Sequence, residues 1–219
     1  MEENALKTLI DKDSFTVLEE NMKEYMKMMY YYKCAVMEIE TKFKVLNEES
    51  FLLNDRNPIQ SIKSRLKTPK SIMSKLKRNN FPFTFSSVEK NLNDVAGIRV
   101  ICSFLSDVYS VAEAFLKQDD IKLIIKKDYI KNPKPNGYRS LHLIVEVPIF
   151  LSDEKKGMKV EIQLRTIAMD FWASLEHQIK YKKDMDFTDD MLGELYKCAE
   201  ESAALDVKMD MLRKTALEC

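Results

Sequence analysis

Two carboxylates in apolar, strand-like runs carry the strongest chemical signal of the sequence. Asp94 opens the run 94–101, and Glu161 lies within the run 159–165. The segment 57–88 has no acidic residue, and its bases are Lys63, Arg65, Lys67, Lys70, Lys75, Lys77 and Arg78. The formal net charge of the chain is zero, so this positive block is local. Carboxylates can hold a divalent cation and bases can hold phosphate, which together predict phosphoryl or pyrophosphoryl transfer.

The run that contains Glu161 alternates polar and apolar residues. Glu161, Gln163 and Arg165 share one face of the predicted strand, and Val160, Ile162 and Leu164 share the other. The polar face is either an exposed sheet surface or a site, and polar groups that recur in neighbouring segments favour a site.

The geometry around Asp94 needs an irregular strand if Asp94 is to act together with Arg99. Taken alone, Asp94 is typical of a turn or a helix end. The two residues are five apart, so an unbroken strand would place them on opposite faces. We therefore predict a bulge or bend at Gly97 that brings both to one face.

A third polar group follows a turn at 132–137 that is rich in proline, asparagine and glycine. Tyr138, Ser140 and His142 should share one strand face, where the tyrosine ring can stack on a base and the histidine can hydrogen-bond it. A core tyrosine with a structural histidine is an equally good interpretation of these residues alone. Lys134 in the turn is a candidate for phosphate binding or a solvated loop charge.

The next helix is predicted to carry a polar stripe. Its members are Asp170, Ser174, His177 and Tyr181. The apolar residues opposite the stripe, expected to be buried, are Phe171, Trp172, Leu175 and Ile179.

These groups are positioned by a mixture of strands and helices. Strands are predicted at 59–66, 95–104, 121–130, 139–147 and 159–164, and helices at 15–49, 69–78, 106–117, 166–181 and 188–217. Thr68, Ser106 and Thr166 are the expected caps of three helices, and 51–58 and 152–157 are expected loops. The fold class is therefore α/β or α+β, with a mixed sheet flanked by helices.

Composition narrows the function classes. The four glycines exclude a glycine-rich phosphate loop, and no apolar stretch is long enough for a membrane span. Cys34, Cys102, Cys198 and Cys219 lack paired metal-ligand spacing and are interpreted as reduced thiols of a cytoplasmic protein. The 219 residues suit one domain, with a core at about 59–181 and helical flanks at 1–50 and 188–219.

Six motifs, in order and at natural spacing, make the chain similar to the synthetase domain of alarmone (p)ppGpp synthetases, above all the stand-alone small synthetases. The motifs lie at 64–67, 71–75, 94–99, 137–142, 160–166 and 171–182. The resemblance implies a nucleotidyltransferase-like fold and transfer of the β,γ-pyrophosphate of ATP to the ribose 3′-hydroxyl of GTP or GDP, with GMP sometimes accepted.

The resemblance also implies roles for residues. Asp94 would bind Mg²⁺, and Glu161 would be a second ligand or the base for the 3′-hydroxyl. The implied ATP-binding residues are Arg65 and Arg99 on adenine and Lys67, Lys75 and Arg78 on the phosphates. The implied acceptor-binding residues are Tyr138 on guanine, Lys134 on phosphates, and Gln163, Asp170 and His142. Ser64 stands where many members carry glycine, and Asp170 where close members often carry asparagine.

The resemblance finally bears on partners. The flanking helices resemble those that assemble small synthetases into homotetramers, and neither a membrane nor a nucleic acid is required. A hydrolase His-Asp dyad is not expected, because His142 and His177 are followed by Leu143 and Gln178. Two other readings remain: a non-catalytic nucleotide or RNA binder, and a transferase acting on RNA or an antibiotic. A binder gains nothing from Asp94 and Glu161, which repel phosphate without a metal.

Overall fold

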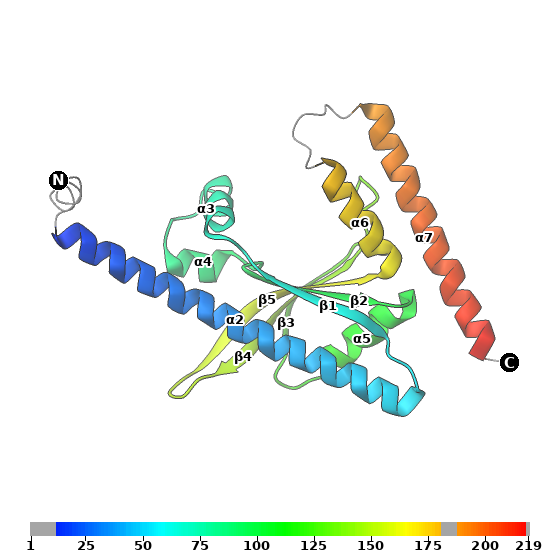
Figure 1. Cartoon of the computed structure of the whole chain (residues 1–219), viewed down its shortest axis with the longest axis horizontal. Helices are drawn as coiled ribbons and strands as arrows, with labels where there is room; N and C mark the ends of the chain where they lie inside the picture. Colours follow the sequence, from blue (N-terminus) through cyan, green and yellow to red (C-terminus); the bar gives the residue numbers. More distant parts are fainter. Residues whose placement is uncertain (1–11, 181–187, 218–219) are drawn as a thin grey trace, which may run out of the picture.

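A computed structural model describes residues 12–180 and 188–217 (Figure 1). Its strands are β1 (Ile59–Leu66), β2 (Ala96–Cys102), β3 (Lys122–Asp128), β4 (Leu141–Phe150) and β5 (Lys155–Thr166). They form a five-stranded sheet in the order β1-β2-β5-β4-β3. The β2–β5 pair is parallel and the other pairs are antiparallel. The predicted mixed sheet is confirmed, and β1 is an edge strand with the predicted bounds.

Helices flank this sheet. They are α2 (Lys12–Asn54), α3 (Pro69–Arg78), α4 (Phe85–Asn91), α5 (Leu105–Leu116), α6 (Ile167–Lys180) and α7 (Asp189–Leu217). In Figure 1, the long helix α2 crosses the sheet. Helices α6 and α7 stand side by side, away from α2. One face of the sheet is therefore covered by a long helix from the start of the chain.

The core lies between α2, α5 and the apolar sheet face. Tyr32, Ile39 and Phe43 of α2 are almost fully buried, and Phe43 stacks on Phe115 of α5 with ring centroids 4.5 Å apart. Val160, Ile162 and Leu164 of β5 belong to the same cluster. The predicted N-terminal flank thus supplies part of the core itself, because its apolar stripe covers the sheet.

Helix ends follow local sequence signals at several places. Thr68 accepts a hydrogen bond from the Ser71 amide at 3.3 Å, and Pro69 occupies the first turn of α3, as predicted. Thr166 caps α6 in the same way through the Met169 amide at 3.1 Å. Helix α2 ends at Asn54, and the next residue, Asp55, forms a left-handed C-terminal cap with a φ of 52°. The predicted loop 51–58 is therefore wrong over 51–54.

Three other local predictions also differ from the structure. Helix α4 was not predicted. The expected loop 152–157 is instead the tip of the β4–β5 hairpin, because β5 already begins at Lys155. Ser106 does not cap α5. The Asp107 carboxylate accepts the Phe104 amide at 3.2 Å, and the Ser106 hydroxyl donates to Asp210 of α7 at 2.6 Å.

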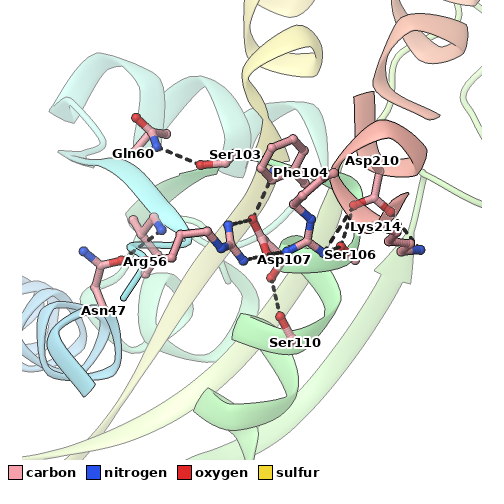
Figure 2. Close-up of polar contacts among 12 residues, drawn as sticks. Asn47, Arg56, Gln60, Ser103, Phe104, Ser106, Asp107, Ser110, Asp210 and Lys214 are labelled. Carbon is pink, nitrogen blue, oxygen red and sulfur yellow. Dashed lines mark hydrogen bonds and ion pairs between the residues drawn. The ribbon is translucent and has the colours of Figure 1, made fainter. Parts of the chain in front are cut away.

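A buried ionic network joins α5, the link before β1, and α7 (Figure 2). The Asp107 residue is only 2% exposed, and Arg56 donates two hydrogen bonds to its carboxylate, at 2.8 and 2.5 Å. Asp210 accepts from Ser106 and pairs with Lys214 at 3.1 Å. The inner face of α7 is therefore held by polar contacts. A cavity of about 610 Å³ lies beside this network, lined by α2, α5 and Arg213.

Two composition-based expectations concern thiols and membranes. Cys34, Cys102 and Cys198 are free thiols, and Cys219 lies outside the described residues. Within the described ranges 12–180 and 188–217, no helix is long and apolar enough to cross a membrane.

Candidate active site

Two rows of paired residues cross the sheet on the face opposite α2. The first row, in strand order, is Lys63, Arg99, Gln163, His142 and Lys127. The second row is Arg65, Gly97, Glu161, Ile144 and Ile125. The strand alternation therefore brings polar side chains from all five strands onto one surface, which includes the polar face of β5.

Asp94 reaches this surface without an irregular strand. It lies in the link between α4 and β2, and the β1–β2 pairing runs regularly from Ser61 to Leu66, past Gly97. The predicted bulge at Gly97 is wrong, because strand parity does not constrain a residue that lies outside the strand. The Arg65 side chain lies over Gly97, where an added Cβ would be in ordinary van der Waals contact at 3.6 Å from the Arg65 Cγ.

The Asp94 carboxylate gathers two of the predicted phosphate ligands. Its Oδ2 accepts hydrogen bonds from Lys67 at 2.9 Å and Lys75 at 2.8 Å. Burial opposes ionisation, but these two bonds outweigh it, so the pKa of Asp94 lies below its ordinary value. Its Oδ1 is buried and has no hydrogen-bond partner among the described residues. One lone-pair-bearing oxygen is thus left for a ligand.

Glu161 is held by its neighbours on the sheet. Gln163 donates to its Oε2 at 3.0 Å, and His142 Nδ1 lies 3.4 Å from its Oε1. Burial again opposes ionisation, but His142 and Gln163 outweigh it, so the pKa of Glu161 is also lowered. Both carboxylates are therefore ionised at neutral pH. They line one cavity of about 240 Å³, together with Lys75, Lys134 and His142.

These carboxylates suit a hard divalent cation that is completed by its substrate. Among the described residues, no group of three or more histidine, cysteine, aspartate or glutamate side chains could hold a metal alone. Mg²⁺, however, is usually bound by one or two carboxylates plus waters and substrate phosphates. The unpaired Oδ1 of Asp94 and the ionised Glu161 fit that requirement.

A second, smaller cavity lies further along the same face. It measures about 130 Å³ and is lined by Arg65, Arg99, Lys63 and Gln163. Burial and the charge of Arg165 lower the pKa of Arg99, which still stays protonated at neutral pH. Arg78 is the last residue of α3 and is exposed, and it lines neither of these two cavities.

Tyr129 lines the larger cavity, and Tyr138 lies next to it without lining that cavity. The Tyr138 hydroxyl lies 2.8 Å from His142 Nε2, and the ring of Tyr129 contacts both side chains edge-on. The Lys134 ammonium sits 4.7 Å from the Tyr138 ring centroid and 4.8 Å from that of Tyr129. The turn therefore places the Lys134 ammonium against two tyrosine rings.

Arg165 lies on the predicted polar face of β5, but no role in the site was predicted for it. Its side chain is 5% exposed and donates to Asp170 at 3.0 Å, to the Tyr138 hydroxyl at 2.7 Å and to Gln163 at 3.1 Å. One guanidinium thus links three of the predicted acceptor residues. The signal was present, because Arg165 continues the alternation of Glu161 and Gln163.

The Asp170 carboxylate forms ion pairs with several basic side chains. Besides Arg165, its carboxylate pairs with Arg99 at 3.1 Å and with Lys63 at 3.8 Å. It lies in the first turn of α6, beside the end of β5. A carboxylate at this position is therefore compensated by three bases from three strands.

Some predicted site or core residues lie elsewhere. Ser140 is fully buried and donates to the Leu164 carbonyl, so it does not share the surface of Tyr138 and His142. Of the four α6 residues that were predicted to be buried, Trp172 alone is buried. Phe171 is 63% exposed, and Leu175 and Ile179 are also exposed, because that side of α6 faces away from the sheet. Tyr181 lies outside the described residues.

Comparisons with known proteins show which proteins this chain is similar to. A family profile described as "Region found in RelA / SpoT proteins" matches residues 64–186. The chain is 44% identical to GTP pyrophosphokinase YwaC of Bacillus subtilis (strain 168) over 193 residues, which are 88% of this chain and 92% of that protein.

Solved structures agree with this comparison. The structure is similar to small alarmone synthetase 2 from Bacillus subtilis, with a TM-score of 0.79 and 43% identity, covering 88% of this chain and 99% of the other. It is also similar to small alarmone synthetase 1 from Bacillus subtilis bound to its product pppGpp, with a TM-score of 0.80 and 32% identity, covering 88% and 98%.

Proposed function

The chain belongs to the RelA/SpoT family, within its small alarmone synthetases, and we propose that it is a GTP pyrophosphokinase acting through the sheet face that carries Asp94 and Glu161. The reaction transfers the β,γ-pyrophosphate of ATP to the 3′-hydroxyl of a guanosine nucleotide. The 3′-oxygen bonds to the β-phosphorus of ATP, the bond from that phosphorus to the α,β-bridging oxygen breaks, and AMP leaves. The acceptor is GTP or GDP, with GMP as a further candidate.

ATP would lie along the β1 side of the surface. Arg65 and Arg99 line the smaller cavity and are suited to stack on adenine through their planar guanidinium groups. Lys67 and Lys75 would take the phosphates, because ammonium groups that already hold the Asp94 carboxylate can turn to a competing anion. Arg78 would have to reach the phosphates from the end of α3.

A divalent cation, which we propose to be Mg²⁺, would be held by Asp94 and Glu161. When bound, it would neutralise charge that develops on the transferred pyrophosphate. Glu161 is ionised and can take the proton of the 3′-hydroxyl at its carboxylate. His142, 3.4 Å from Glu161 Oε1, orients that carboxylate.

The acceptor would lie along the β4 side. The ring of Tyr138 offers a stacking surface for guanine, and Lys134 can leave its seat between the two tyrosine rings to meet the acceptor phosphates. Gln163 and Asp170, both held by Arg165, would face the nucleoside. The observation that carries the proposal is that an acid pair, lysines and tyrosine rings lie together on one sheet face.

Self-association into a homotetramer through the outer faces of α2 and α7 is part of the proposal. On α7, Asp206 and Asp210 point inward and are buried, whereas Leu205, Met209 and Leu212 are exposed at successive turns. On α2, Met22, Met26 and Tyr30 are likewise exposed at successive turns. Monomeric soluble proteins rarely show such contiguous apolar surface. The three free thiols fit a reducing cytoplasm.

The decisive assay uses ATP labelled at the γ-phosphate and GTP, GDP or GMP offered separately with Mg²⁺. Label should appear in a guanosine product, with one AMP formed for each transfer. Label released only as free phosphate or pyrophosphate would contradict the proposal. Nucleotide binding without any transfer would instead favour a non-catalytic binder.

A further inference from the structure

The C-terminal helix α7 lies directly against the turn that carries Lys134 and Tyr138. Gly137 has a φ of 84°, and a Cβ added to it would fall 2.5 Å from the Ala199 Cβ of α7. Tyr138 in turn packs on a small buried cluster formed by Trp172, Ala173 and Ala199. The turn is therefore seated on the helix with no space for a side chain between them.

Arg139 ties the two segments together. Its Nη1 donates to the carbonyl oxygens of Gly137 at 3.2 Å and Ala199 at 3.4 Å, and its Nη2 donates to Glu200 at 2.8 Å. The Arg139 side chain is 14% exposed and that of Glu200 is 48% exposed, so the guanidinium is largely shielded from water while its ion pair with Glu200 is partly open to it. The Arg139 guanidinium thus bonds the turn through Nη1 and bonds α7 through both Nη1 and Nη2.

The turn itself is short and has few bonds of its own. The Gly137 amide donates to the Lys134 carbonyl at 2.8 Å, and the Lys134 amide donates to the Tyr138 carbonyl at 3.1 Å. The Tyr138 amide also donates to Asn136 Oδ1 at 3.3 Å, and the Asn136 side-chain nitrogen donates to Glu176 of α6 at 3.1 Å. Beyond these bonds, the position of the turn depends on its contacts with α7. Since Lys134 and Tyr138 face the site, a shift of the turn would move both together.

We propose that α7 acts as the seat of the acceptor-binding turn, and that Arg139 and Glu200 are positioning residues for the acceptor nucleotide. The proposal rests on the function proposed above. Neither residue lines the two cavities of the site. They act through Gly137 and Tyr138, so their loss should weaken acceptor binding and leave ATP binding unchanged.

The first test separates the two Michaelis constants. Arg139→Gln should raise the acceptor KM about tenfold, as expected when a charge-assisted hydrogen-bond set is lost. Glu200→Gln should raise it about threefold, because this ion pair is partly exposed. Arg139→Lys should recover part of the loss. In all three, kcat and the ATP KM should stay within about twofold of wild type.

Glu194→Gln is the matched control on the same helix, since among the described residues Glu194 pairs with Lys197 alone, and both are exposed. It should leave all constants unchanged. Equal rises in both Michaelis constants for Arg139→Gln, or none, would overturn the positioning role.

The second test needs no activity and so stands apart from the proposed reaction. Amide hydrogen exchange of the peptide 131–140 should become faster in Arg139→Gln and Glu200→Gln and stay unchanged in Glu194→Gln. Trp172, the chain's only tryptophan, donates to the Leu195 carbonyl of α7 at 2.9 Å, so its fluorescence reports whether α7 stays docked. Faster exchange with unchanged Trp172 emission supports the proposal. Unchanged exchange in both variants refutes it, whereas an inactive wild type would refute only the reaction.

Discussion

Removing one hydroxyl, in Tyr138→Phe, tests how the acceptor wall is built. The ring, and with it the stacking surface worth ~1–3 kcal/mol, is retained. The substitution removes two hydrogen bonds of the hydroxyl: the one that it accepts from Arg165 at 2.7 Å and the one that it makes with His142 Nε2 at 2.8 Å. The substitution therefore isolates the part of Tyr138 that positions the ring from the part that stacks.

The magnitude follows from these two bonds. A hydrogen bond to a charged group contributes about 1.5–3 kcal/mol and a neutral one about 0.5–1.5 kcal/mol. Arg165 keeps its bonds to Asp170 and Gln163, so part of the loss is recovered. A net cost of ~1.5 kcal/mol remains, which corresponds to about a tenfold rise in the acceptor KM. The ATP KM should not change, because Arg65 and Arg99 lie in the other cavity.

Initial rates at saturating ATP with varied GDP, and the reverse, give the two constants. Glu194→Gln, the exposed change on α7 used above, controls for nonspecific effects. An acceptor KM within about twofold of wild type would refute the reasoning. It would mean that Arg165 and His142 do not hold the ring where the nucleotide meets it.

Three further predictions concern the carboxylates and assembly. Asp94→Ala and Glu161→Ala should each lower turnover at least about a hundredfold, which corresponds to a rise of ~3 kcal/mol in the activation free energy. Circular dichroism should show that the fold is retained. Turnover above about a tenth of wild type would contradict the role of the carboxylate. Because the pKa of Asp94 is lower in the folded chain than its ordinary value of 3.8, the ionised carboxylate stabilises the fold. This stabilisation is fully present above pH 3.8 and is lost as the pH falls through the pKa of Asp94 in the folded state. The difference in Tm between wild type and Asp94→Asn should therefore be constant above about pH 5 and shrink in stronger acid, and a difference that grows in acid would be inconsistent with this linkage. Light scattering after size exclusion should give a mass near four chains, and Leu205→Glu with Met209→Glu on α7 should reduce it, whereas a wild-type mass near one chain at micromolar concentration would exclude the oligomer.

Local signals predicted the elements whose ends are set by neighbouring residues. Thr68 and Pro69 fix the start of α3, and the alternation in β5 correctly sorted Glu161 and Gln163 from the core. Helix α4 was missed because Phe85–Asn91 is too short to show helical periodicity. The exposure of Phe171 could not be foreseen, because hydrophobicity does not say which side of α6 meets the sheet.

Site residues were predictable where a strand or turn presents them directly. His142 and Glu161 come together because β4 and β5 pair in a fixed register, and Tyr138 meets His142 from the turn that precedes β4. Arg165 escaped prediction because its role depends on Asp170 and Tyr138, which approach it only in the folded chain. The same holds for the contact of Gly137 with Ala199, which joins residues far apart in sequence.

The burial of α2 has a consequence for synthesis of the chain on the ribosome. Ile39 and Phe43 emerge early, yet they share a core with Val160 and Ile162, which are made more than a hundred residues later. At ~5–20 residues per second, the apolar stripe of α2 waits several seconds before β5 exists to cover it. Such long-range contacts also slow folding, because the loop must close before they form. Nascent chains of this protein should therefore bind chaperones through α2, and truncations that remove this helix should aggregate.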